Sequence, residues 1–498
     1  MRVKPTQHIL LIAAALILSV PVKAQLDTVH YLSPFHAVVN SQIEDHFIYL
    51  STPESIPFTV TAKDGSGNTI GTKSISNAIS DTLYLGYGQS PGTKMMIPID
   101  SLNNILQSSG LIISGPKPFY VNFKAMRIFQ AGSLTSKGRA GLGNMFRYGG
   151  FPQLADKANV RNFVASMMAT EDSTFVQITD YDPGVVFAGT PDVYSDTLSF
   201  MLNTGESYVI SGNTTVTTAN LSGFMGALIT STKPITVNNG NWCGTITNQS
   251  TWQDIAIDQS VSVNALGTDF ILVEGNGTSD MEKGIVVAHY DNTTVYAGGN
   301  IVGTIDGGDF LLIDNSYYGG SSHKNMYVHT SEPAYMYQAL GSNSNEATPG
   351  MNFIPHFSCL LSDTIGPMPK IEEIGSMTYS AAVIAFTRTG ATLSLNGNPQ
   401  IGAEPIAGLP NWESYKITGV TGDILVTSTM PVGAGAFGYN GDAGYAAYFT
   451  GFGHDLKGAS LVDSACAPAM LTEVNGLFDS YQWLLDGLPI AGETGTSY

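Results

Sequence analysis

The segment Gly88-Gln-Ser-Pro-Gly92 matches the G-x-S-x-G pattern that places a nucleophilic serine in many hydrolases. In that motif, the residue after the serine donates its backbone N–H to the oxyanion. Here that residue is Pro91, which has no N–H to donate. The flanking residues also favour strands, whereas a nucleophile elbow needs a helix after the serine. We therefore predict no catalytic role for Ser90.

Residues that could bind a metal are scattered along the chain. The nine histidines include no H-E-x-x-H motif, and the nearest useful pairs are His289 with Asp291 and His454 with Asp455. Either pair would need further ligands from elsewhere in the fold to hold a transition metal. Structural roles are therefore favoured for the histidines, and no metal or other cofactor is predicted.

Two acidic segments offer oxygen atoms that calcium prefers. Glu171 and Asp172 are adjacent, and Asp180 and Asp182 precede a Pro-Gly dipeptide. The ligand series of an EF-hand is absent, however. An Asp-Pro-Gly sequence is explained equally well by turn formation. Calcium binding and turn formation are both left open.

Lys137, Arg139 and Arg147 form the one mildly basic stretch of the chain, in a glycine-rich setting. The residue order of a P-loop is missing. The glycines would let backbone N–H groups approach an anion, so these three residues are a candidate ligand-binding site. The alternative is a long connection between repeats, in which the three cations pair with nearby acids. The excess of acidic residues favours that alternative.

The cysteines at positions 243, 359 and 466 are too few for a disulfide framework. An odd number in an exported protein implies a free thiol or a partner outside the chain. Cys243 and Cys359 are a candidate disulfide between two repeats, which would contribute up to about 4–5 kcal/mol of stability in the chain-entropy model. The alternative is two buried thiols. Cys466 is expected to pair beyond Tyr498.

The composition of the chain is that of an exported all-β protein. Of the 498 residues, 12% are charged and 43% hydrophobic, which excludes intrinsic disorder, and 55 are glycine. Residues 1–24 contain a basic start, an apolar run at 9–20 and small residues at Val22 and Ala24, as in a secretory signal peptide. The apolar run is shorter than the roughly 20 residues that span a membrane. No membrane span is expected in the mature chain.

The negative net charge excludes some classes of binding partner. Removing residues 1–24 lowers the formal charge from −19 to −22, because Arg2, Lys4 and Lys23 are lost. Nucleic-acid affinity comes mostly from neutralising phosphates, so we expect no nucleic-acid partner. Anionic lipid is disfavoured for the same reason. A basic protein or a neutral glycan is expected instead.

Short runs of alternating polar and apolar residues, rich in β-branched and aromatic side chains, predict strands throughout the chain. One helix is predicted after Asp100, with Leu102, Ile105 and Leu106 on one face and Gly110 as its end.

An internal repeat organises these strands. Four segments read as a strand, a bend and a second strand, with a proline at the bend: Pro118, Pro234, Pro333 and Pro431. Proline fits the bend because it interrupts a ladder between strands. A hairpin pattern precedes each of the last three copies, and two of them also carry a Gly-x-x-Tyr/Phe strand start. The sequence therefore predicts four pseudo-repeats of about 100 residues, arranged as tandem β-sandwich or propeller-like modules.

The C-terminal residues have a different pattern. Cys466, followed 17 residues later by Trp483, resembles the start of an immunoglobulin-like sandwich. Such a domain needs close to 100 residues. We therefore expect residues 25–455 to form the repeated β domain and residues 456–498 to be an incomplete Ig-like or PKD-like domain of a longer protein.

Several short segments of the chain together carry a resemblance to a known domain. They are Gln130-Ala-Gly-Ser-Leu-Thr-Ser-Lys-Gly-Arg139, Gly141-Leu-Gly143, Phe146-Arg147, Met168-Ala-Thr-Glu-Asp172, Asp182-Pro-Gly184, Ala288-His-Tyr-Asp291 and Asn352-Phe-Ile-Pro355. Over about residues 29–455 the chain resembles the N-terminal domain named after the IgGFc-binding protein. In bacteria this domain occurs in exported surface proteins, often before PKD- or Ig-like domains and a gliding-motility-associated sorting domain. The resemblance implies type IX export and a binding or adhesive role, but not binding of antibody.

Two classes of function follow. The favoured class is a secreted or cell-surface, non-enzymatic binding or adhesion protein with a protein or glycan ligand. The alternative is a secreted polysaccharide-directed hydrolase, which needs two facing carboxylates about 5–9.5 Å apart. A deep pocket with two unpaired acids would favour the hydrolase, and shallow aromatic surfaces would favour the binding protein.

Overall fold

The structure, a computed structural model, describes residues 25–37, 44–89, 91–154, 162–247, 253–344, 348–358 and 361–451. It adds four short strands farther along the chain: β36 (Ala459–Leu461), β37 (Leu471–Val474), β38 (Leu484–Leu485) and β39 (Leu488–Pro489). The predicted signal peptide lies outside the described residues, as does most of the predicted Ig-like segment. Those two domain assignments stay predictions.

The described chain is all-β, as predicted. Its helices are short 3-10 turns, and none of them has the length and apolar character needed to cross a bilayer. They are η2 (Pro91–Thr93), η3 (Ile99–Ser101), η4 (Gly138–Gly141), η5 (Thr218–Leu221), η6 (Val263–Ala265) and η7 (Asn315–Tyr317).

Each of the first three modules is built on one long strand that bends and has a different set of partner strands on either side of the bend. In the first module this strand is β7 (Leu111–Arg127). Its first residues pair with β1 and β3, and its last residues pair with β2 and β8, while Asp27 of β1 also pairs with Phe119, directly after the bend. Pro118 lies between the two sets of pairs, where a missing N–H costs no ladder bond. The remaining strands are β1 (Asp27–Leu32), β2 (Asp45–Ser51), β3 (Phe58–Asp64), β4 (Thr69–Ile75), β5 (Asp81–Tyr87) and β8 (Gln130–Thr135).

The second module repeats this pairing around β16 (Leu228–Gly244). Residues before Pro234 pair with β11, residues after it pair with β10 and β17, and β9 pairs on both sides of the proline, with an irregularity between Thr230 and Ile235. The other strands are β6 (Ile105–Leu106), β9 (Leu142–Arg147), β10 (Asn162–Ala169), β11 (Thr174–Thr179), β12 (Val186–Phe187), β13 (Val193–Tyr194), β14 (Leu198–Leu202), β15 (Ser207–Asn213) and β17 (Asp254–Gln259).

The third module does the same around β23 (Asn325–Gly341). Residues before Pro333 pair with β18 and β20, and residues after it pair with β19 and β24, while Gly267 of β18 also pairs with Ala334, directly after the proline. Its other strands are β18 (Gly267–Val273), β19 (Lys283–Ala288), β20 (Thr293–Ala297), β21 (Asn300–Ile305), β22 (Phe310–Ile313) and β24 (Pro349–Phe353).

In the fourth module the long strand is divided into β33 (Ile424–Ser428) and β34 (Val432–Asn440), with Pro431 between them. The four prolines therefore occupy equivalent places in the strand pairing. The other strands are β25 (Thr364–Met368), β26 (Glu373–Ile374), β27 (Met377–Thr378), β28 (Ser380–Arg388), β29 (Leu393–Leu395), β30 (Asn398–Pro399), β31 (Glu404–Pro405), β32 (Trp412–Val420) and β35 (Ala443–Tyr448).

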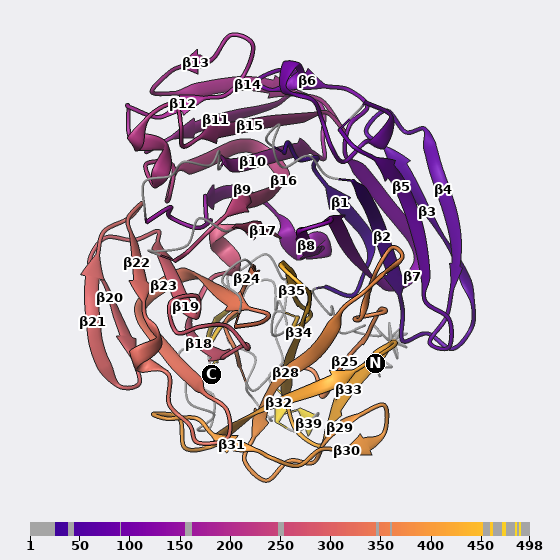
Figure 1. Cartoon of the computed structure of the whole chain (residues 1–498), viewed down its shortest axis with the longest axis vertical. Helices are drawn as coiled ribbons and strands as arrows, with labels where there is room; N and C mark the ends of the chain where they lie inside the picture. The colour runs from indigo at the N-terminus through magenta and orange to yellow at the C-terminus, as the bar shows by residue number, and fades with distance from the viewer. Residues whose placement is uncertain are drawn as a thin grey trace, which may run out of the picture.

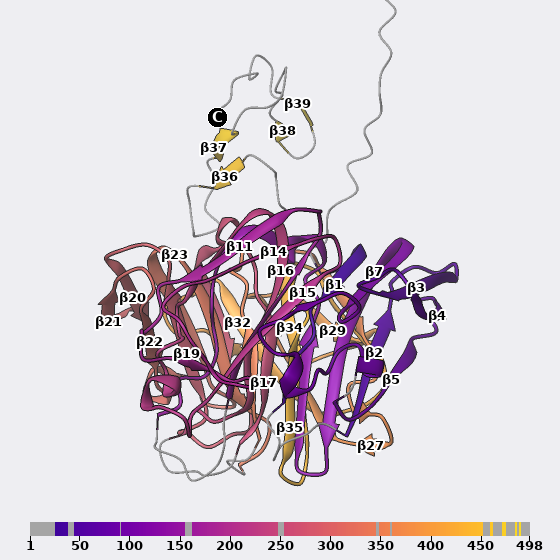
Figure 2. The ribbon, with the colours of Figure 1, turned by 90° about the horizontal axis from the view of Figure 1, so that it is seen from above.

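The four modules stand in chain order around a common axis (Figure 1). Strands β8, β17, β24 and β35, one from each module, lie nearest the axis, and each contacts its neighbours in the ring. Seen from the side, the hairpins β7–β8 and β34–β35 reach the lower face of the ring (Figure 2). The long strand thus carries one bent sheet in each of the first three modules and is split between two sheets in the fourth, and the four modules together form a propeller-like ring.

The predicted helix after Asp100 is wrong. Only Ile99–Ser101 is helical, and Ile105–Leu106 forms the strand β6. β6 pairs with Ser207 and Tyr208 of β15, so this connection from the first module extends a sheet of the second. Backbone pairing with a distant strand overrides the helical spacing of the three apolar side chains.

Each hydrophobic core contains side chains from two neighbouring modules. The core of the first module includes Trp242 and Ile257 of the second. The second shares its core with the third, and the third with the fourth. The core of the fourth module takes in Tyr120 and Ala131 of the first, which closes the ring. Burial of apolar surface therefore depends on the neighbouring module at all four junctions.

A buried lysine joins the last module to the first. The Lys124 ammonium, on β7, donates to the carbonyl oxygens of Lys370 at 2.8 Å and Glu373 at 3.1 Å. It also lies 4.3 Å from the centroid of the Tyr49 ring. Burial lowers the pKa of Lys124 to about 7, while the acidic residues of the same loop oppose this shift. The carbonyls and the ring face both favour the charged form.

A close backbone approach joins the second and third modules. Gly226 precedes β16, and Gly308 lies in the predicted Gly-x-x-Tyr/Phe strand start before β22. Both residues have positive φ, +75° and +95° respectively, which favours glycine. A Cβ added at Gly226 would lie 1.7 Å from the Gly308 carbonyl oxygen. The contact therefore requires glycine at position 226 for space as well as for conformation.

Replacing Gly226 by alanine tests this approach. We expect Gly226→Ala to lower the free energy of unfolding by about 1–2 kcal/mol for the left-handed backbone and by a further 1–3 kcal/mol, roughly, for overpacking. The midpoint of urea unfolding measures the loss. Gly397→Ala is the matched control, because Gly397 has a φ of +79° and open space around its added Cβ. Equal midpoints for the two variants would contradict the close approach.

Candidate binding surface

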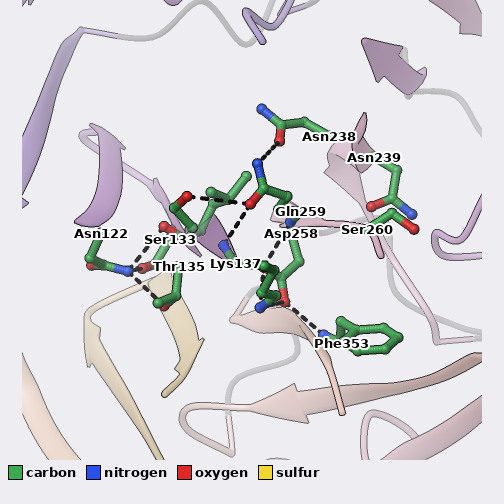
Figure 3. A network of polar contacts seen from close by, with 12 residues as sticks. Asn122, Ser133, Thr135, Lys137, Asn238, Asn239, Asp258, Gln259, Ser260 and Phe353 are labelled. Carbon is green, nitrogen blue, oxygen red and sulfur yellow. Dashed lines mark hydrogen bonds and ion pairs between the residues drawn. The ribbon is translucent and has the colours of Figure 1, made fainter. Parts of the chain in front are cut away.

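The predicted ligand residue Lys137 lies at the ring axis, directly before η4, and is fully buried (Figure 3). Its ammonium donates to both carboxylate oxygens of Asp258 on β17, at 3.1 and 3.2 Å. The same carboxylate accepts the backbone N–H of Phe353, from the third module, at 2.8 Å. Burial lowers the pKa of Lys137, and the attraction of Asp258 opposes that shift. Three modules therefore meet at one ion pair.

Side-chain amides complete the polar contacts around this ion pair. Gln259 accepts the backbone N–H of Lys137 at 2.6 Å and donates to the side-chain oxygen of Asn238 at 3.2 Å. Asn122 donates to the hydroxyls of Ser133 and Thr135 at 2.9 and 3.0 Å (Figure 3). Buried polar groups need such partners, because water is not there to replace them.

Arg139 and Arg147 also pair with acids. The Arg139 side chain binds Asp27, with Nη2 2.6 Å from Oδ1. Burial alone would raise the pKa of Asp27, but the hydrogen bonds and charge of Arg139 lower it. Arg147 donates to Asp180 at 2.8 Å and to the Gly226 carbonyl at 3.0 Å, beside the junction of the second and third modules. Each of the three predicted cations therefore faces a different carboxylate, and ligand binding by them stays a prediction.

Asp182, one of the candidate calcium ligands, accepts the N–H of Gly184 at 2.7 Å, a hydrogen bond that is typical of a turn. Among the described residues, no group of three or more His, Cys, Asp or Glu is placed to hold a metal ion. Cys243 is buried. Cys359 and Ser90 lie outside the described residues, so the disulfide stays a prediction.

Two further buried carboxylates, which sequence reasoning did not single out, are held by backbone N–H groups. Asp254, on β17, accepts from Ala131 of the first module and from Gly444 of the fourth, both at 2.6 Å. Burial raises the pKa of Asp254 well above its usual value. Glu282 accepts from three glycine N–H groups at 2.9–3.0 Å, and burial raises its pKa to about 8. Both acids therefore have structural partners.

The third module carries a row of side chains across four paired strands on its outer surface. In register, Ile301 of β21 lies opposite Tyr296 of β20, Tyr296 opposite His329 of β23, and His329 opposite Asp269 of β18. The Tyr296 and His329 rings have centroids 5.7 Å apart. Ile301 is 64% exposed and the His329 side chain 36% exposed. We call these four residues the third-module row.

Asp269 fixes the orientation of the third-module row. Its Oδ1 accepts from the Tyr327 hydroxyl and lies 2.9 Å from Nδ1 of His329. Burial, followed by the bond to Asp269, raises the pKa of Tyr327 well above its usual value, so this hydroxyl stays a donor. Because Nδ1 of His329 faces Asp269, Nε2 is the ring nitrogen available to a ligand. A fixed aromatic and imidazole surface of this kind can bind a partner at low entropic cost.

The sequence contained a partial signal for this row. The alternation of Thr294, Tyr296 and their neighbours predicts a strand, with these side chains on one face. The pairing of Asp269 with His329, 60 residues later, depends on strand register and has no local signal.

The comparisons with known proteins identify one family. The family model described as IgGFc binding protein matches residues 131–438, from β8 to β34. The match includes the second and third modules and the third-module row, but it leaves out most of the first module. The search of curated proteins found no match.

Removing the cation at the axis tests the contribution of the buried pair. We expect Lys137→Met to cost about 3–5 kcal/mol of unfolding free energy, because Asp258 is left buried without its cation. The control is Lys73→Met, which breaks the partly exposed Lys73–Asp81 pair and should cost less than about 1 kcal/mol. Urea unfolding of both variants gives the comparison. Losses of equal size would refute a special role for the axial pair.

The pKa of Glu282 predicts a pH dependence of stability. A carboxyl whose pKa is raised on folding stabilises fully below its unfolded pKa and loses that contribution as the pH rises to about 8. Between pH 5 and pH 8 we expect Glu282→Gln to remove a decline of roughly 1 kcal/mol per pH unit. Thermal unfolding across this range measures the slope. The exposed Glu332→Gln variant should keep the parental slope, and an unchanged slope in Glu282→Gln would count against a protonated Glu282.

Proposed function

The chain belongs to the IgGFc binding protein family, and from this premise we propose that it is an exported, non-enzymatic binding protein with a protein ligand. The family match spans the modules that carry the third-module row. The buried acids at the axis and at Glu282 have structural partners, which leaves the outer sheets to make contact with other molecules.

The observation that carries the proposal is the third-module row. Ile301 and Tyr296 supply apolar and aromatic area, and His329 supplies a polar group fixed by Asp269. Tyrosine is enriched among the residues that dominate protein interfaces. The strands of the row are part of a rigid module, so a ligand meets a surface that is already in its binding conformation.

We further propose that the protein acts outside the cell, in adhesion or surface attachment linked to gliding motility. The basic and apolar pattern of residues 1–24 supports secretion. The family resemblance supports a type IX route and surface display. The excess of acidic residues supports a basic partner and disfavours nucleic acid.

An array identifies the partner class. Residues 25–498 are applied to immobilised host proteins, immunoglobulin Fc and glycans at 0.1 M and 1 M salt. We expect saturable binding to a protein with a basic surface, weaker at high salt because the Debye length falls from about 10 Å to about 3 Å. Binding to glycans alone, or saturable turnover of an arrayed polysaccharide, would overturn the proposal.

The third-module row predicts which variants lose binding. We expect Tyr296→Ala and Ile301→Ala each to weaken binding of the protein found on the array by about tenfold, as for interface residues worth 1–2 kcal/mol, roughly. Phe175→Ala is the matched control, because Phe175 is an exposed aromatic residue on β11, the equivalent strand of the second module. Surface plasmon resonance gives the affinities. Equal losses in all three variants would place the ligand elsewhere.

A further inference from the structure

A second aromatic surface lies at one end of the first module, outside the residues that the family model matches. Tyr84 and Tyr87 of β5 are 53% and 68% exposed. In register, Tyr84 lies opposite Phe47 of β2, and Tyr87 lies opposite Asp45. Two exposed tyrosines so close together on a folded sheet are unusual, because single exposed aromatics are normally scattered.

Tyr84 is held in one orientation. Its hydroxyl donates to Oδ1 of Asp45 at 2.8 Å, and its ring lies 5.3 Å from the ring of Phe47. Phe47 is itself backed by Gly375 of the fourth module, where an added Cβ would lie 2.6 Å from the Phe47 ring. The hydroxyl contact with Asp45 and the ring contact with Phe47 therefore fix the Tyr84 side chain before any ligand binds. Little conformational entropy remains to be lost on binding.

The exposed apolar area continues onto the neighbouring hairpin. Met126 of β7 lies opposite Asp45, and the turn after it exposes more than half of both Ile128 and Phe129. With strands about 4.8 Å apart, Tyr87 and this turn are separated by roughly 10 Å. All of these residues fit within the footprint of one protein partner, about 800 Å². We call Tyr84, Tyr87, Asp45, Ile128 and Phe129 the first-module patch.

The charges around the first-module patch favour a cation. Asp45 lies between the two tyrosines, and the electron-rich faces of the rings attract positive groups. Lys124 on the adjacent strand is buried, Lys73 is paired with Asp81 at 3.0 Å, and Arg127 in the hairpin turn has an interaction of its own. The chain as a whole carries a formal charge of −19. The charge at the first-module patch and the net charge of the whole chain are therefore both negative.

We propose that the first-module patch binds an arginine- or lysine-bearing segment of a protein partner. A guanidinium or ammonium group would stack on Tyr84 and Tyr87 and pair with Asp45. The apolar stem of the same side chain, or a neighbouring apolar residue, would cover Ile128 and Phe129. This site is separate from the third-module row and needs none of its residues.

Model peptides test the patch in the full mature chain. The probes are an alternating Arg-Ala peptide, an alternating Glu-Ala peptide of equal length, and cellohexaose as a neutral glycan. Isothermal titration calorimetry at 0.1 M and 1 M salt gives affinity and stoichiometry. We expect one-to-one binding of the Arg-Ala peptide, weaker at high salt, and none of the Glu-Ala peptide. Cellohexaose binding that is lost in Tyr84→Ala would overturn the proposal in favour of a glycan site.

Substitutions separate a defined site from general attraction to an acidic protein. The double variant Tyr84→Ala/Tyr87→Ala should lose about tenfold in affinity for the Arg-Ala peptide, from two exposed cation–π contacts. Asp45→Asn should lose affinity and part of the salt dependence. Tyr194→Ala is the control, since Tyr194 is an exposed tyrosine of the second module. Equal affinities for the double variant and the control, with both folded by circular dichroism, would overturn the proposal.

The outcomes for the two surfaces are distinguishable. Loss of array binding in Tyr296→Ala with normal Arg-Ala affinity would support both surfaces independently. Loss of Arg-Ala binding in Tyr296→Ala, with none in Tyr84→Ala/Tyr87→Ala, would overturn the first-module patch and leave the proposed function standing.

Discussion

Two carboxylates on one strand hold the ring together. Asp254 and Asp258 of β17 take hydrogen bonds from Ala131 and Lys137 of the first module, Phe353 of the third and Gly444 of the fourth. A carboxylate removed from water needs this many donors, since leaving it unpaired costs several kcal/mol. The donors belong to different modules, so they come together only when all four modules have taken their places.

The same constraint explains where contacts with other molecules can form. The strands nearest the axis are buried, and their polar groups are used in holding neighbouring modules. In the third module, β20 and β21 lie at the perimeter of the ring (Figure 1). Tyr296 lies on β20, and His329 lies on the paired strand β23. Tyr84 lies on β5, an edge strand of the sheet of the first module, and is exposed. Both proposed binding surfaces therefore lie on the perimeter of the ring.

Much of the fold could be predicted, because local chemistry specifies it. A proline at the bend of a long strand, as at Pro234, and a glycine with positive φ, as at Gly308, carry their structural meaning in one or two residues. The helix predicted after Asp100 was wrong, because Ile105 pairs with a strand a hundred residues away. The partners of Lys137 were unpredictable for a related reason. The sequence favours pairing of this lysine with a nearby acid, but its partner is Asp258, 121 residues later, which the closed ring brings to the ammonium.

The shared cores also constrain how such a chain can evolve. In an open repeat array each unit contacts only its neighbours, so units can be added or removed and the ends need only be capped. Here the fourth core is completed by Tyr120 and Ala131 of the first module, so there is no end at which to insert a copy. A deletion or duplication of one repeat would misalign the donors to Asp254 and open a core at the same time. A change in repeat number therefore carries a cost here that it does not carry in an open array.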